Sequence, residues 1–251
     1  MSAAGDLREQ VADAHRLPVG REQLRRAEDL VARADELGDV AAQVDARLLL
    51  ISAVNYGDTA APERRYGAFA WVLARWDEDP TVFDRLLRHQ LFWYFKWVTV
   101  GAVDFPQVPL AQLERSLADM HDRYLRAGEG LAPVHHSRFR VFGDVGGQGD
   151  PRTAAAYREW MASPRTELSD CVACEPTDRV ERLVALGADE EAIEVAVPVL
   201  QDAGCREQPA RMINSVLPAL LRTGRTGKAA AEHARAVRQS VRLDGATARL
   251  D

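Results

Sequence analysis

Apolar residues recur three or four positions apart along most of the chain, which is the spacing that places them on one face of an α-helix. From residue 21 onward Leu24, Leu30 and Ala34 follow this pattern, and Gly38 stands where a left-handed residue would end the helix. Alternating strand patterns are nearly absent. The chain is therefore expected to be all-α, with an N-terminal helix or arm at 1–20 and helices at 21–37, 40–54, 62–76, 81–100, 108–127, 130–142, 151–162, 176–186, 189–201, 209–223 and 227–241.

The short connectors between these predicted helices make consecutive helices antiparallel. A glycine precedes an alanine by five residues at Gly149, Gly187 and Gly224, so the same pair returns at spacings of 38 and 37 residues. Glycine permits a tight turn between two helices, and the alanine lets the second helix approach the first closely. A recurring period of this length favours a stacked array of hairpins over a closed bundle.

Residues 149–241 resemble the tetratricopeptide repeat (TPR) family, whose unit is about 34 residues of helix, turn and helix. The best matching segments are residues 183–200 and 220–237. In the second segment Gly224, Ala229, His233 and Ala236 occupy the family's turn glycine, small residue, large aromatic and second small residue. The resemblance implies a right-handed solenoid of about five antiparallel helix pairs.

We therefore expect a single α-solenoid domain over residues 1–251. After the arm at 1–20, residues 21–165 would form divergent hairpins, and the glycine and alanine pairing is lost upstream of Gly149. Residues 166–241 would form TPR-like hairpins, and residues 242–251 would be a tail.

The charge pattern narrows the classes of function. Acidic and basic residues are interleaved and sum to a net charge of -6, which gives no electrostatic surface for nucleic acid. No run of about 18 uncharged apolar residues occurs, so no membrane span is expected. The first ten residues lack the apolar segment of a secretory signal, and we expect a cytoplasmic protein.

Three cysteines are the strongest chemical signal in the sequence. Cys171 and Cys174 form a CxxC segment just before Pro176, a residue that suits the first turn of a helix. A turn at a helix N-terminus points two sulfurs at one place, and the positive end of the helix favours the thiolates that a metal requires. The pair is expected to bind zinc.

Cys205 lies beyond the next predicted helix, and an antiparallel hairpin would return it to the level of Cys174. His233 is the candidate for a fourth ligand, because the resembling family places an inward-packing aromatic at its position. With three thiolates and one imidazole, a tetrahedral zinc site has no open position and is structural. Weaker alternatives for the fourth ligand are His136, Asp170 and Glu175.

Two other interpretations of the cysteines stay open. They could form a metal-free thiol cluster, or a redox-active pair, although the βαβ pattern that surrounds a thioredoxin-like site is absent. The DCxxCEP segment, followed by a later cysteine and a helix that contains Ala-His, also resembles a type of actinobacterial repeat protein. That resemblance implies that the site is a family trait and attaches no activity to it.

Residues 91–97 form an aromatic segment, LFWYFKW, with two interpretations. A helix that is apolar on every side is typical of the middle of a stack, where neighbours flank it. Alternatively, Trp93, Tyr94 and Trp97 share one face and line a groove that binds a partner, because aromatic residues often anchor interfaces.

Catalytic motifs with plausible spacing are missing from the sequence, so we expect no enzyme. The function expected is a protein- or peptide-binding scaffold with a structural zinc site. The alternatives are a regulatory module cut from a longer protein, and an enzyme with an unrecognised helical active site. The last helical face, near residues 227–241, is a candidate surface for self-association.

Overall fold

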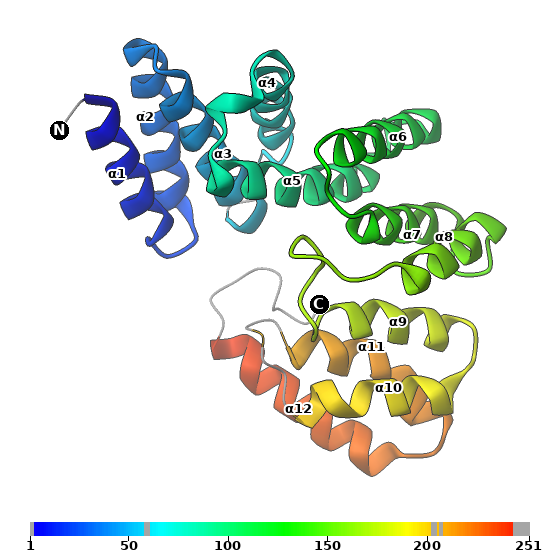
Figure 1. Ribbon diagram of the computed structural model, residues 1–251. Coiled ribbons are helices and arrows are strands. Elements are labelled where there is room, and N and C mark those ends of the chain that lie inside the picture. Colours follow the sequence, from blue (N-terminus) through cyan, green and yellow to red (C-terminus); the bar gives the residue numbers. More distant parts are fainter. Residues whose placement is uncertain (1–2, 58–60, 202–204, 206–207, 243–251) are drawn as a thin grey trace. The chain divides into compact units, whose positions relative to one another are not determined.

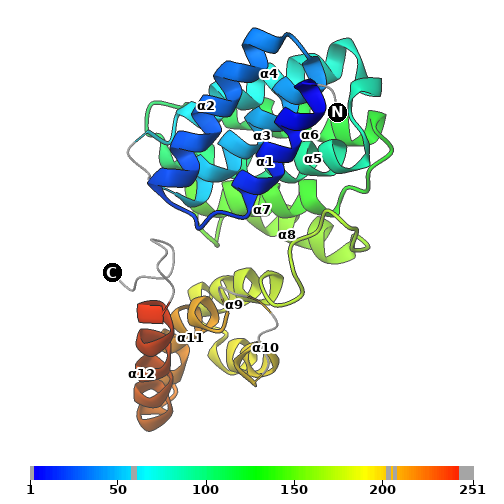
Figure 2. The same cartoon turned by 90° about the vertical axis from the view of Figure 1, so that its left-hand side faces the viewer.

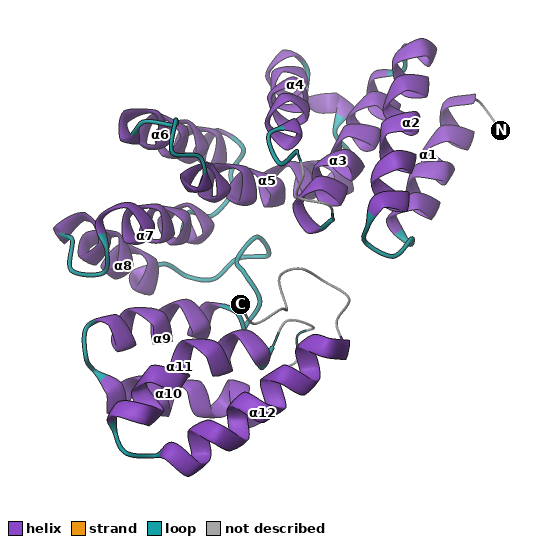
Figure 3. Ribbon diagram, turned by 180° about the vertical axis from the view of Figure 1, so that it is seen from behind, coloured by secondary structure: helices purple, strands orange, loops and turns teal. Residues whose placement is uncertain are grey.

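The computed structural model describes residues 3–57, 61–201, 205 and 208–242. Within these ranges all regular structure is helical, in twelve α-helices and two short 3-10 helices, without a strand (Figure 3). The prediction of an all-α protein is confirmed. The predicted tail beyond Arg242 lies outside the described residues.

The chain divides into two compact units, residues 1–129 and residues 130–251. The expectation of one continuous domain over residues 1–251 stays a prediction. All candidate metal ligands belong to the second unit, and the aromatic segment belongs to the first.

The first unit is built from helices that pack against their neighbours in the sequence. In addition, α3 packs against both α1 and α5, and is therefore the central helix of this unit. Its elements are α1 (Ala3–His15), α2 (Arg21–Leu37), α3 (Val40–Tyr56), α4 (Arg64–Glu78), η1 (Pro80–Val82), α5 (Arg85–Val100), η2 (Gly101–Asp104) and α6 (Leu110–Arg126).

The helix predicted at 81–100 begins later than expected. The carboxylate of Asp84 accepts hydrogen bonds from the backbone N–H groups of Leu86 and Leu87 at 2.9 and 3.0 Å, so Asp84 caps α5. The residues before it form the separate turn η1, whose second residue, Thr81, donates its backbone N–H to Asp79. Capping by Asp79 and Asp84 therefore divides the single helix predicted at 81–100 into η1 and α5.

Within its described residues, the second unit consists of six helices arranged as three consecutive pairs. Each pair packs together, and α11 also packs against α9 and α10, with α12 alongside α11 (Figure 1, Figure 2). The bounds are α7 (Ala132–Gly146), α8 (Pro151–Ala162), α9 (Glu175–Ala185), α10 (Asp189–Gln201), α11 (Ala210–Arg222) and α12 (Thr226–Arg242).

Two of the predicted turn glycines close their helix pairs as expected. Gly187 and Gly224 have positive φ angles of 77° and 76°, a conformation that glycine adopts at no steric cost. After Gly224, the N–H of Arg225 donates to the carbonyl of Leu220 at 2.8 Å, which closes the helix end with a Schellman motif. The alanines five residues beyond the glycines, Ala192 and Ala229, are 0% and 3% exposed and pack in the core of the second unit.

The third predicted turn glycine, Gly149, lies between α7 and α8 as expected, but another glycine ends the first of these helices. Gly147 ends α7 with a φ of 76°, whereas Gly149 is not among the glycines with positive φ. Asp150 caps the next helix by accepting from the N–H of Arg152 at 2.7 Å, and Gly149 only links these two signals. The period of 38 residues therefore does not connect equivalent turn positions.

In the described part of the chain, none of the helices combines the length and the apolar character needed to cross a membrane.

Candidate metal centre

The CxxC segment forms the turn that the sequence predicts. The backbone N–H groups of Cys174 and Glu175 both donate to the carbonyl of Cys171, at 3.0 and 3.2 Å. Cys174 is the residue that precedes α9, and Pro176 stands in the first turn of that helix. The turn therefore holds both thiols at the N-terminus of α9.

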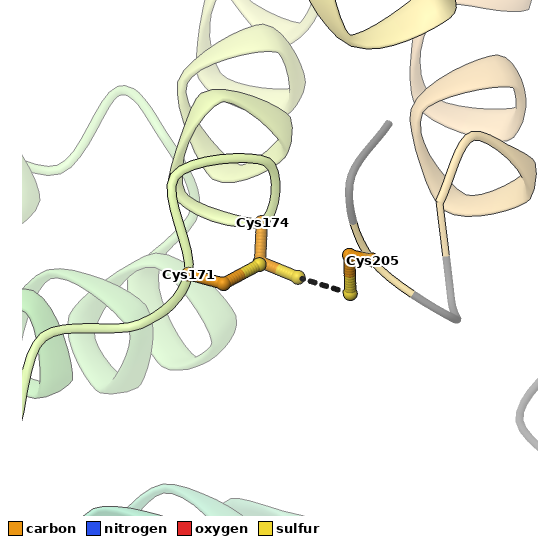
Figure 4. A group of neighbouring side chains, drawn as sticks. All are labelled: Cys171, Cys174 and Cys205. Carbon is orange, nitrogen blue, oxygen red and sulfur yellow. Dashed lines mark hydrogen bonds between the residues drawn. The ribbon is translucent and has the colours of Figure 1, made fainter. Parts of the chain in front are cut away.

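Cys205, on the connection between α10 and α11, faces this turn. Its sulfur is 3.7 Å from the Cys174 sulfur, although the two residues are 31 positions apart, and the three sulfurs lie within 4.8 Å of one another (Figure 4). Tetrahedral zinc with Zn–S bonds of about 2.3 Å places neighbouring sulfurs about 3.8 Å apart. The spacing of the Cys174 and Cys205 sulfurs therefore suits two ligands of one ion.

The buried side-chain amide of Gln208 lies next to the three-cysteine cluster. Gln208 is 2% exposed, and its Nε2 group lies 3.9 Å from the Cys174 sulfur. The same amide donates to the Thr177 hydroxyl at 2.9 Å and accepts from the N–H of Met212 at 3.0 Å. These bonds fix the amide so that it offers an N–H donor to the sulfur, the kind of outer contact that orients and tunes metal ligands. The sequence contains no signal for this role.

The thiols differ in their tendency to ionise. Burial opposes ionisation of Cys171, but hydrogen bonds from the Cys174 thiol and from backbone N–H groups outweigh it, so the pKa of Cys171 is lowered. The pKa of Cys174 is raised, first by burial and then by its neighbour Cys171. The cluster thus favours ionisation of Cys171 over ionisation of Cys174, and a bound cation would favour the loss of both protons.

The structure does not bring His233 to the sulfurs. Its side chain is exposed on α12, outside the three-sulfur group. Ala229 and Ala236 form the buried stripe of this helix, and His233 lies to one side of that stripe. The weaker candidate Glu175 is engaged elsewhere, since it forms an ion pair with Arg165. Among the described residues, the protein therefore offers three ligands at this centre.

The other two alternatives, His136 and Asp170, belong to a second group together with Asp178. The Nε2 atom of His136 lies 2.7 Å from a carboxylate oxygen of Asp178, and its Nδ1 atom lies 3.6 Å from one of Asp170. The ring of His136 also stacks on Trp160, with 4.0 Å between the centroids. The two carboxylates approach opposite ring nitrogens, and one ligand atom from each of the three residues lies within 4.8 Å of the others, so they form a separate polar group beside the cysteine turn.

Some residues of the aromatic segment at 91–97 lie in the core of the first unit, and others are partly exposed. Tyr94 is 6% exposed, whereas Trp93 and Trp97 are half-buried. All three line a pocket of about 300 Å³, together with Tyr56, whose ring meets Trp97 edge-on at 4.8 Å. Phe92, from the same helix, is buried in the core. One edge of α5 thus carries a partly open aromatic surface, and the binding of a partner there stays a prediction.

No protein-family model, no curated protein and no solved structure matches this chain. The similarity to the TPR family and to actinobacterial repeat proteins stays a prediction from the sequence.

Proposed function

We propose that this chain is a non-catalytic, TPR-like scaffold that binds a protein or peptide partner and whose second unit is held together by one structural zinc ion. The single observation that carries the proposal is the convergence of Cys171, Cys174 and Cys205 from two separate segments. Thiolates are the ligands that zinc prefers in structural sites. The fourth position would be filled by a ligand other than His233.

Zinc at this place would cross-link two segments of the second unit that are 31 positions apart in the sequence. Cys174 stands at the start of α9, and Cys205 stands on the connection between α10 and α11. An ion bound to both would fix the beginning of one helix to the beginning of the helix after next. Because a metal that binds only the folded state adds its binding free energy to folding, zinc would stabilise this unit.

The stacking of two consecutive hairpins is supported by a pair of ion pairs between them. Arg222 donates to Asp189 at 2.8 Å, and Arg225 donates to Glu190 at 2.9 Å, so the end of α11 and the turn that follows it are paired with the start of α10. These partners are 33 and 35 positions apart, close to the length of a TPR unit. This pairing favours a solenoid of antiparallel hairpins in the second unit.

Partner binding is proposed for the pocket lined by Trp93, Tyr94 and Trp97. Large aromatic side chains supply most of the binding energy at many interfaces. We expect Trp97→Ala to leave the secondary structure intact and to abolish retention of a partner in pull-down assays from the native cell. A variant that unfolds would show instead that this edge of α5 is core.

The zinc proposal is tested by the metal content of protein purified without oxygen and without metal affinity resin. We expect about one zinc per chain in the wild type and in His233→Ala, and little in Cys174→Ser or Cys205→Ser. Removal of zinc by a chelator should lower the melting temperature. Metal-free wild-type protein with unchanged melting would contradict the proposal and favour a metal-free thiol cluster.

A further inference from the structure

A second pocket, of about 270 Å³, lies next to the cysteine turn and within the second unit. Its apolar walls come from Trp160 and Met161 of α8, Val172 of the CxxC segment and Pro176 of α9. Two of these side chains are unusually open for apolar residues, since Val172 is 76% exposed and Met161 is 42% exposed. An open apolar wall of this kind has surface to offer to a ligand.

Two arginines line the same pocket, and they differ in their partners. Arg165 donates to the backbone carbonyl of Asp170 at 2.5 Å and forms an ion pair with Glu175, which also lines the pocket. Arg179, in contrast, has no hydrogen bond or ion pair among the described residues, and its Nε atom is buried without an acceptor. A buried N–H donor without an acceptor is costly, and the half-buried side chain that carries it has no carboxylate partner within the described residues.

The charges select the type of anion. Arg165 and Glu175 neutralise each other, which leaves the pocket with the single positive charge of Arg179. One planar guanidinium group can pair with one carboxylate through two hydrogen bonds. A phosphate dianion would be repelled by the nearby carboxylate of Glu175 and would have only one guanidinium group to bind it. A monocarboxylate is therefore the better complement.

The walls and the volume select the rest of the ligand. Small-molecule sites are mostly apolar with a few placed polar groups, and their volumes begin at about 300 Å³. This pocket is close to that lower limit and holds a body of about one aromatic ring. The hydroxyl-bearing residues Ser163 and Ser169 lie in its lining as well. The geometry suits a compact amphiphilic acid.

We propose that this pocket binds a small monocarboxylic acid with an apolar body, whose carboxylate pairs with Arg179 and whose body packs on Trp160, Met161 and Val172. The inference adds a small-molecule ligand to the proposed scaffold. It does not depend on the identity of the partner at the aromatic pocket. Because Val172 lies between two metal-ligand candidates, the acid would also contact the metal-binding turn.

The test uses the full chain, purified with its metal, and titrates it with phenylacetate, octanoate and phenylacetamide while NMR amide shifts are followed. We expect the two acids to bind at millimolar or lower concentration and to shift the signals of residues around Val172 and Arg179. The uncharged amide should bind at least about tenfold more weakly, because it lacks the charge-assisted pairing.

Two variants separate recognition from folding. Arg179→Gln should weaken the binding of phenylacetate at least about tenfold, since the bonds to a charged partner are lost. Met161→Glu should also weaken the binding of phenylacetate, because the new carboxylate on the pocket wall repels the carboxylate of the ligand. The control, Arg158→Gln, changes an exposed arginine of α8 that does not line the pocket and should bind as the wild type does.

Equal binding of acid and amide, equal binding by Arg179→Gln, or no binding of either acid to the folded wild type would overturn the proposal. Zinc content is measured on the same samples. Loss of acid binding with zinc retained contradicts only the ligand site, and loss of zinc from the wild type contradicts only the metal site.

Discussion

Protons and a metal ion compete for the sulfur atoms of the three cysteines. Zinc binds thiolates, so each thiol that is protonated in the free protein must release its proton when the metal binds. The raised pKa of Cys174 means that this thiol is protonated at neutral pH in the absence of metal. The lowered pKa of Cys171 makes its thiolate available at lower pH.

Zinc affinity should therefore fall as the pH falls. With at least one proton released for each ion bound, we expect the association constant to decrease by about tenfold or more per pH unit between pH 8 and pH 6. Competition with a chromophoric chelator at several pH values measures this slope. An affinity that is independent of pH in this interval would show that thiols are not the ligands.

For single residues, the sequence was sufficient to predict that the three cysteines lie close together. It was not sufficient for residues whose role depends on the direction of the side chain. The CxxC turn is local, and Cys205 is carried back by the geometry of one hairpin, so both could be inferred. His233 could not, because its direction depends on which stripe of α12 is buried. Gln208 was missed since an amide becomes a sulfur donor only through tertiary contacts.

At the scale of helices, a network of polar side chains connects three helices of the second unit. His136 from α7 is 3% exposed and bonds Asp178 of α9, while Asp170 approaches it from the cysteine turn. Arg211 of α11 lies 3.6 Å from the second oxygen of Asp178. The network thus helps to fix the helices around the turn that bears Cys171 and Cys174.

Replacing the histidine should be costly. His136→Ala leaves the buried carboxylate of Asp178 without its closest partner, and we expect a loss of about 3 kcal/mol in the free energy of unfolding. The matched control, His233→Ala, removes an exposed histidine of the same unit and should change stability by less than about 0.5 kcal/mol. Urea unfolding measures both, and equal effects would argue against the network.

The turn glycines allow a second test of the helical hairpins. Gly187→Ala and Gly224→Ala force a Cβ into the left-handed region and should each cost about 1 kcal/mol. Gly227, in the first turn of α12, does not have a positive φ, and a Cβ added there would meet open space. Gly227→Ala should therefore keep or slightly raise stability in thermal melts. Losses of the same size at all three sites would contradict the role of the turns.

Helix positions were largely predictable because the apolar period and the glycine and proline signals are local and strong. The errors have a common cause. Asp84 and Asp150 cap helices through side-chain hydrogen bonds, which a search for apolar periodicity does not see. This capping explains both the late start of α5 and the shift of the turn glycine from Gly149 to Gly147.

At the scale of the whole chain, the division into residues 1–129 and 130–251 predicts which part the proposed zinc would stabilise. All three cysteines lie in the second unit, so removal of zinc should increase amide exchange there and leave the first unit unchanged. Hydrogen exchange followed by mass spectrometry, with and without chelator, resolves the two ranges. A uniform increase over both would show that the chain unfolds as one cooperative unit.

The sequence alone predicted a single array and contained no visible break near residue 129. The region between α6 and α7 carries ordinary turn signals, Gly128 and Gly130, like those between other helices. A boundary between units is set by which helices pack together. That depends on long-range contacts that local periodicity does not encode.

X-ray absorption at the zinc edge, measured on the full chain, shows directly which atoms surround the ion. We expect about three sulfur neighbours at about 2.3 Å and one lighter neighbour, nitrogen or oxygen, for each zinc. The same spectrum should be obtained from His233→Ala. Zinc surrounded only by nitrogen and oxygen, or protein that carries no zinc after purification without oxygen, would contradict it.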